Sequence, residues 1–521
     1  MNELVARLGK SVKGVLKGFD RIVFKGTVLP LVRQEGAMDF LKARRILNKD
    51  YKRWMQAQTE ALEQAVDRYA LEQCGKPIKY LGTWRTDKEK LAKRQQSVAN
   101  IESGLIGVWS CLESGRSYRA EFSKRKGYPQ LRNYRTQCKH LYLYFDHKQY
   151  GWMSVRLQTW FPYHIQIAMN GREWLRRRLE AADMDFLCEG NKFLHIDDHS
   201  RAQRFLDQQV KRRWVPLLNS FLPVAFPTMS DALGPHLSYY WTLWQSEWAT
   251  DLIVEKPSDL NAVMHSLLRH AWITGNSTRV LRYLGRPVTT AGRPHSLLKN
   301  EVTSRLMDFH EGLRVRHWVD HNSVKIYNEF NNLRIETTMN TPGMFNVYRR
   351  AQGEPEDAPK KRRPLRKGVA DIPLRAIVSE DINERFMTAV STFEDHTPVR
   401  TLIAEHITSH TKQGRRIRAL DISGKDRELL LAIADPAFTV SGITNAALRE
   451  KLQRTLWGAG RTDKQLSARI TRHLRLLRDH GLIRKVPNRR RYQLTRKGNQ
   501  LTSALNAMLA ASTDQLIQIA A

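Results

Sequence analysis

Residues 463–494 read DKQLSARITRHLRLLRDHGLIRKVPNRRRYQL, and this stretch decides the fold of the C-terminal part of the chain. An apolar residue recurs every three or four positions between Asp463, the predicted N-cap, and His480, which predicts an amphipathic helix. Its apolar face consists of Leu466, Ile470, Leu474 and Leu477. Gly481 can adopt the left-handed conformation that ends a helix, so we expect the helix to stop there.

The remainder of this helix and the segment after it are strongly basic. Beyond Gly481, two short strands are expected on either side of a turn at Pro487-Asn488. A basic helix followed by a β-ribbon is typical of a winged helix-turn-helix, in which the helix lies along the major groove of DNA and the ribbon contacts the minor groove or phosphates. The predicted nucleic-acid-binding residues are Lys464, Arg469, Arg472, Arg475, Arg478, Arg489, Arg490 and Arg491. A module used only for protein contacts is the alternative.

The charge of the whole chain also indicates a nucleic-acid partner. Its 521 residues include 86 Lys and Arg against 52 Asp and Glu, a formal net charge of +34. A positive field of this size attracts phosphate backbones. No run of about 18 apolar residues occurs, so no membrane partner is expected. The four widely spaced cysteines favour a reducing compartment, and we expect a cytoplasmic protein without a zinc finger.

Four regions are predicted along the chain, with an α+β fold. Residues 1–350 form a mixed nucleic-acid-engaging body of one or two sub-domains, because helical spacing at 51–74 gives way to an antiparallel strand pattern at 105–169. Residues 351–370 form a proline-rich basic linker, 371–425 an all-helical connector, and 426–521 the winged helix-turn-helix. Phosphate contacts from the linker are assigned to Lys360, Lys361, Arg362 and Arg363.

Three stretches resemble known families. LLRDHGLIRKVPNRRRYQLTRKG, at 476–498, resembles the MarR-like winged-helix regulators. The series of motifs from GFDRIVFKGTVLP at 18–30 to this module is similar to a family of bacterial proteins of about the same length, whose N-terminal body is uncharacterised. NSVKIYNEFNNLRIETT, at 322–338, and FDRIVFKG, at 19–26, resemble paired strands of plasmid rolling-circle replication initiators, although the His-apolar-His metal motif of many such enzymes is missing.

The third resemblance implies phosphodiester chemistry in the body. A tyrosine would attack the phosphodiester while carboxylates hold Mg²⁺ or Mn²⁺, which neutralises the developing charge. Tyr327, Glu336 and Asp20 are the catalytic candidates that follow from it. The candidate metal partners are Glu247, Asp251 and Asp320. A structural role is the alternative, in which Tyr327 packs and Glu336 pairs with Lys325 or Arg334.

Two aromatic clusters, at 158–174 and 239–251, have two interpretations. Their rings could stack on unpaired bases, or Trp160, Phe161, Trp241 and Trp244 could fill the core between sheet and helices, which is the commoner use.

The leading hypothesis is a DNA-binding protein of mobile-element type, a replication initiator or transposase-like protein with metal-assisted strand cleavage. The alternatives are a non-catalytic MarR-like transcriptional regulator and a structured-RNA-binding protein. An oligomeric form is compatible with all three.

Overall fold

The structure is a computed structural model of an α+β protein, as the sequence predicts. It describes residues 4–510 except 6–7, 274, 276, 286–301, 310–311, 352, 356, 392–402, 405–406, 436–437, 439–441 and 487–490. One compact unit contains residues 14–251 and 338–380. The other contains the described residues of 1–13, 252–337 and 381–521.

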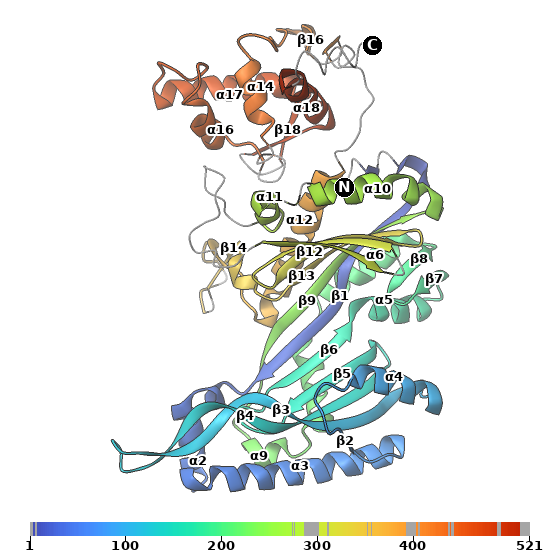
Figure 1. Ribbon diagram of the computed structural model, residues 1–521, viewed down its shortest axis with the longest axis vertical. Coiled ribbons are helices and arrows are strands. Elements are labelled where there is room, and N and C mark those ends of the chain that lie inside the picture. Colours follow the sequence, from blue (N-terminus) through green and yellow to red (C-terminus); the bar gives the residue numbers. More distant parts are fainter. Residues whose placement is uncertain are drawn as a thin grey trace. The chain divides into compact units, whose positions relative to one another are not determined.

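The described strands of the main sheet follow the order β9-β1-β6-β5-β4-β3-β2 in the first unit (Figure 1) and β10-β11-β12-β13 in the second. Strand β2 pairs parallel with β3, whereas β3-β4, β4-β5, β5-β6, β1-β6, β10-β11 and β11-β12 are antiparallel pairs. The strands are β1 Val12–Thr27, β2 Lys79–Tyr80, β3 Gly104–Ser123, β4 Tyr128–His147, β5 Gly151–Gln158, β6 Ile165–Asn170, β9 Tyr240–Val254, β10 Thr303–Phe309, β11 Gly312–Val319, β12 Asn322–Glu329 and β13 Asn332–Met339.

The antiparallel meander predicted at 105–169 is confirmed as β3 to β6. Strands β3 and β4 continue as a long hairpin through 114–137, which the sequence did not reveal because polar residues occupy both of its faces. Helix α3, Tyr51–Cys74, has the predicted bounds and packs on β3. Helix α4, Lys88–Ala99, also packs on β3, through Ala92 against Trp109.

In the sequence, Asn170 followed by Trp174, Leu175 and Leu179 predicts a helix that begins at Gly171, and helix α5, Gly171–Glu180, confirms it. The Asn170 side chain accepts hydrogen bonds from the backbone N–H groups of Arg172 (2.7 Å) and Glu173 (3.1 Å), as an N-cap does. A Cβ atom on Gly171 would lie 2.3 Å from the carbonyl oxygen of Phe19, so only glycine allows α5 to approach β1 this closely.

The turn-forming pair Gly190-Asn191 before the strand-like KFLHI predicts a hairpin, and the pair β7 Phe186–Glu189 and β8 Lys192–Ile196 confirms it. It leads into α6, His199–Val210. The remaining helices of this unit are α2 Gln34–Ala43, α7 Trp214–Asn219, α8 Leu222–Ala225 and α9 Met229–Leu233.

The predicted linker at 351–370 contains regular structure. Strand β15, Lys361–Pro364, pairs with β14, Asn346–Arg349, and the Lys367 carbonyl accepts a hydrogen bond from the Leu243 N–H of β9 (2.7 Å). The sequence suggested a solvated linker because prolines and charges dominate it. The segment is instead held by Arg349 of β14, whose guanidinium donates to the Pro364 carbonyl at 2.8 Å.

The prediction that residues 371–425 are all helical was wrong. Helix α12 occupies Ile372–Val390, but β16 His410–Lys412 and β17 Arg415–Ile417 form a hairpin. Its turn has Gln413 and Gly414 at positive φ. Three-residue strands are too short for alternation to be recognised in the sequence. Two further helices of this unit are α10 Pro257–Ile273 and α11 Ser277–Tyr283.

The C-terminal module, residues 426–510, combines helices with a small β-ribbon. Its elements are α14 Arg427–Ile433, α16 Asn445–Leu452, α17 Asp463–Asp479, β18 Ile483–Lys485, β19 Tyr492–Leu494 and α18 Arg496–Ala510. A bridge between Ile443 and Tyr492 widens the ribbon. The N-cap of α17 is Thr462, one residue before the predicted one, because its hydroxyl and the Gln465 side chain form a capping box.

Among the described residues, no helix combines the length and apolar character needed to cross a membrane.

Candidate nucleic-acid interface and acidic candidates

Helix α17 is fixed in the module by its apolar face and by one asparagine. The four predicted face residues are all buried in one cluster with residues of α14, α16 and α18. The Asn445 amide of α16 donates to the Ser467 carbonyl (2.8 Å) and the Thr471 hydroxyl (2.9 Å), and the Ser467 hydroxyl donates back to Asn445 at 3.0 Å. These contacts fix the orientation of α17 about its axis.

Four of the five basic residues predicted on α17 point to solvent. They are Lys464, Arg472, Arg475 and Arg478, all exposed. Arg469 does not belong with them, because its guanidinium lies 3.9 Å from the centroid of the Trp457 ring and donates to the Trp457 carbonyl at 2.9 Å. Helical spacing alone did not separate Arg469 from the exposed face, since the loop that covers it comes from residues before the helix.

The ribbon and a neighbouring hairpin add further basic residues. Arg491 is exposed, whereas Arg489 and Arg490 lie outside the described residues. Lys412 and Arg415 of the β16-β17 hairpin were not among the predicted residues. Both are exposed, and they lie 3.6 and 3.9 Å from the Asp479 carboxylate at the end of α17. No pattern in the sequence places these two residues beside α17.

The module is also held by a buried ion pair. The Arg418 guanidinium donates to both carboxylate oxygens of the fully buried Asp426, at 2.6 and 2.8 Å. Burial would raise the pKa of Asp426, but the hydrogen bonds from Arg418 and the Asp421 backbone, together with nearby positive charge, hold it below its usual value. Asp426 is therefore charged at neutral pH and attaches the segment after β17 to α14.

The basic run at 360–363 lies at β15. Lys360, Lys361 and Arg362 are exposed, as a phosphate-binding role requires. Arg363 pairs with Glu354 at 2.5 Å.

Three of the acidic candidates lie on strands of the sheet. Asp20 of β1 and Glu247 of β9 belong to the unit of residues 14–251 and 338–380, whereas Glu336 of β13 belongs to the other unit. Asp20 and Glu336 are buried and Glu247 is half-buried. The Asn191 amide in the β7-β8 turn donates to Asp20 at 2.6 Å.

Arg375 of α12 anchors the strand that carries Glu336. Its guanidinium donates to the Ser246 hydroxyl (2.8 Å) and the Leu243 carbonyl (2.6 Å) of β9, and also to the Met339 carbonyl at the end of β13. Arg375 thereby ties β13 to β9 three residues beyond Glu336.

Tyr327 and Lys325 both contact Glu336. The Tyr327 hydroxyl donates to one carboxylate oxygen of Glu336 at 3.4 Å, and the Lys325 ammonium lies 2.6 Å from the other. The Arg314 guanidinium lies 4.3 Å from the centroid of the Tyr327 ring. The ion pair with Lys325 is the contact that a structural role would use, while the tyrosine beside a carboxylate is what a nucleophile would need.

The other two acidic candidates are placed elsewhere. Asp251 forms an ion pair with Arg172 at 2.9 Å, and both side chains are fully buried. Asp320 lies in the β11-β12 turn with φ +48°. Alternation along the strands does not show which carboxylate pairs with a buried arginine.

The chemistry of the remaining carboxylates fits a hard divalent cation, because Mg²⁺ and Mn²⁺ prefer oxygen ligands. That Glu247 or another of these residues holds such an ion stays a prediction.

The aromatic clusters divide between core and surface. Phe161 is buried against Phe40, Tyr51 and Trp54, and Trp241 is buried as well, as the core interpretation expects. Trp244 is 40% exposed, so it does not belong to the core.

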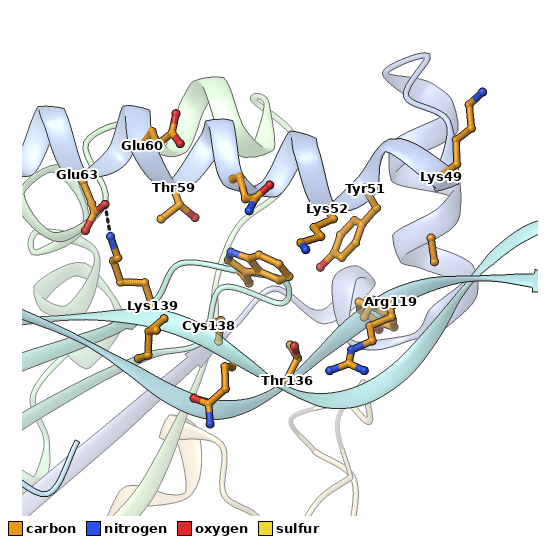
Figure 2. Close-up of a pocket in the computed structure, with 16 residues that line it drawn as sticks. Lys49, Tyr51, Lys52, Thr59, Glu60, Glu63, Arg119, Thr136, Cys138 and Lys139 are labelled. Carbon is orange, nitrogen blue, oxygen red and sulfur yellow. Dashed lines mark hydrogen bonds and ion pairs between the residues drawn. The ribbon is translucent and has the colours of Figure 1, made fainter. Parts of the chain in front are cut away.

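Trp160 lines a pocket of about 710 Å³ between α3 and the β3-β4 hairpin (Figure 2). Lys49, Lys52 and Arg119 lie at one end of this pocket, and an ion pair of Glu63 with Lys139 (2.7 Å) lies at the other. This mixture of charges does not favour one class of ligand.

Comparison with known proteins identifies no relative: no family model, no curated protein and no solved structure matches the chain.

Proposed function

We propose that the C-terminal module is a winged helix-turn-helix that binds duplex DNA, with α17 in the major groove. The observation that carries this proposal is the exposed row Lys464, Arg472, Arg475 and Arg478, opposite a buried apolar face. A helix fixed on one side and basic on the other can lie between two phosphate backbones. The ribbon with Arg491 and the hairpin with Lys412 and Arg415 would contact the flanking phosphates.

Binding is tested with the full-length protein and duplex DNA from the flanks of its own gene. Replacing Arg472, Arg475 and Arg478 by alanine should lower the affinity and reduce the slope of log affinity against log salt by about 0.9 for each lost phosphate contact. A control with the same loss of charge replaces Arg53, Arg125 and Arg204, which are exposed elsewhere. An equal loss of affinity in both variants would mean that only net charge matters and that α17 does not contact the DNA.

We further propose that the protein is of the mobile-element type and cleaves a DNA strand with Tyr327 as the nucleophile. The support is the hydrogen bond that the Tyr327 hydroxyl donates to the Glu336 carboxylate at 3.4 Å. A bound Mg²⁺ or Mn²⁺ would supply charge neutralisation for the phosphodiester. Tyr327 would attack the phosphorus, Glu336 would accept the phenolic proton, and the strand's leaving oxygen would depart as the tyrosyl phosphodiester forms.

The cleavage proposal is tested on supercoiled DNA that carries the same flanks, with Mg²⁺ or Mn²⁺. The expected result is a nicked circle with protein covalently attached to the DNA, and both should be lost in Tyr327→Phe. Glu336→Gln should also abolish nicking. Asp320→Asn changes a carboxylate of the β11-β12 turn, is the matched control and should leave nicking unchanged. Duplex binding without any nick would leave the non-catalytic regulator, and preferential binding of structured RNA would favour the RNA-binding alternative.

A further inference from the structure

A row of polar and aromatic side chains crosses four adjacent strands of the sheet. Lys25 of β1 is the direct partner of Gln166 on β6, and Gln166 is the direct partner of Arg156 on β5. Because direct partners point to the same side of a sheet, these three side chains share one face. Trp244 of β9 extends the row, since the Lys25 ammonium lies 4.8 Å from the centroid of its ring.

The ammonium groups of two lysines lie over the Trp244 ring. The Lys367 ammonium lies 4.0 Å from the ring centroid, closer than that of Lys25. Lys367 reaches this position because its backbone carbonyl bonds to the Leu243 N–H, beside the tryptophan. Even with both contacts, 40% of Trp244 and 42% of the nearby Tyr240 remain exposed. Part of the Trp244 ring is thus exposed to solvent beside the Lys25 and Lys367 ammonium groups.

The positive charges of this row are crowded. Burial lowers the pKa of Lys25, and the charges of Arg156, Lys367 and Arg116 lower it further. Glu113 pairs with Arg156 at 2.5 Å, but it also lies 3.3 Å from the Lys88 ammonium. Cations that repel one another beside an exposed ring are stabilised when an anion binds between them.

We propose that this row, made of Trp244, Lys25, Lys367, Gln166 and Arg156, binds single-stranded nucleic acid. One unpaired base stacks on Trp244, and backbone phosphates contact Lys25, Lys367 and Arg156. Lys25 and Arg156 are two strands apart, roughly 10 Å, so they contact different phosphates of an extended strand. A duplex fits less well, because its bases are already stacked on one another and offer no free face to the ring.

This surface is distinct from the exposed face of α17, and the inference does not depend on the function proposed for the C-terminal module. It gives the protein a second contact with nucleic acid, selective for the unpaired state. Such a contact would hold a strand that has been separated from its complement.

The experiment measures binding of a fluorescent deoxythymidine oligonucleotide to the full-length protein over a series of salt concentrations. Trp244→Ala should weaken binding by about 5- to 150-fold, the range that loss of one base stack produces. Lys25→Gln combined with Lys367→Gln should reduce the salt slope by about 0.7 for each lost phosphate contact. An oligouridine arm shows whether DNA or RNA binds more tightly.

Trp84→Ala is the matched control, because Trp84 is also exposed and lies beside a cation, the Arg85 guanidinium at 5.7 Å, but is outside the row. It should leave single-strand affinity unchanged, and circular dichroism establishes that every variant folds. Unchanged single-strand affinity in both row variants would overturn the proposal.

The triple arginine variant of α17 separates this inference from the function proposed above. It should weaken duplex binding while single-strand binding persists. Loss of single-strand binding in that variant, with retention in Trp244→Ala, would place the strand on the C-terminal module and also overturn the proposal.

Discussion

Arginine has opposite roles in α17 and in the body of the protein. Arg472, Arg475 and Arg478 extend from α17 into solvent, whereas Arg172 and Arg375 are almost completely buried and bond to a carboxylate, a hydroxyl or carbonyl groups. A surplus of +34 therefore does not measure the surface that meets a polyanion. Part of the positive charge holds strands together, and only the exposed part can bind phosphate.

The largest effect is expected at the buried pair. Arg172→Ala should lower the free energy of unfolding by about 3 to 5 kcal/mol, because the Asp251 carboxylate is left buried without this partner. Urea denaturation measures the change. The double variant Arg172→Met with Asp251→Leu should recover much of it, since neither charge is then buried. A loss of under about 1 kcal/mol in Arg172→Ala would mean that the two buried charges are not coupled.

A smaller effect on stability is expected from protonation of the buried His140 at low pH. Burial is the main reason that the pKa of His140 is lowered to about 4, so the folded protein keeps this ring neutral. The unfolded chain takes up the proton near pH 6.5, so stability should fall by up to about 3 kcal/mol as the pH decreases from 6.5 to 4. His140→Gln should remove this part of the pH dependence. The exposed His236→Gln is the control, and an identical profile in His140→Gln and the wild type would contradict the prediction.

In the C-terminal module, the capping box of α17 should contribute about 1 kcal/mol. Thr462→Ala removes the hydroxyl that accepts from the Gln465 N–H. Thermal unfolding monitored by circular dichroism measures the loss, and Thr462→Ser should restore most of it. If Thr462→Ser is as destabilising as Thr462→Ala, the hydroxyl is not the stabilising group.

The smallest effect on stability is expected on the exposed face of α17. Arg472→Ala should change the free energy of unfolding by no more than about 0.5 kcal/mol, because Arg472 is exposed on the face opposite the apolar cluster. The same substitution at Arg469, which stacks on Trp457, should cost more. Equal stability of the two variants would mean that the contact of Arg469 with Trp457 does not stabilise the module.

Local sequence patterns predicted much of the fold. The bounds of α3, the cap of α5, the β7-β8 hairpin and the apolar face of α17 all depend on residues close together in the chain, where periodicity and capping are informative. The β16-β17 hairpin and β10 were missed. The pattern of residues 313–339 predicts three strands with the first turn at His321-Asn322, but the β11-β12 turn lies one residue earlier, at Asp320-His321. Short strands and turn positions are weakly encoded locally.

The candidate sites show the same division. Tyr327 and Glu336 were singled out on consecutive strands, and their side chains bond to each other. Asp251 was singled out as well, but it pairs with Arg172, which is far from it in the sequence. Lys367 beside Trp244 could not be foreseen either, because the segment around it had the composition of a linker.

The bond between Lys367 and Leu243 has a practical consequence for dissecting the protein. The proline-rich composition suggests Pro355 as a place to truncate the chain. A fragment that ends there contains β9 but lacks Lys367 and Arg375, so it loses the hydrogen bonds to the Leu243 N–H and the Ser246 hydroxyl. The segment 351–370, which has the composition of a linker, is therefore bonded to the sheet. Fragments meant to isolate the C-terminal module should therefore begin after α12.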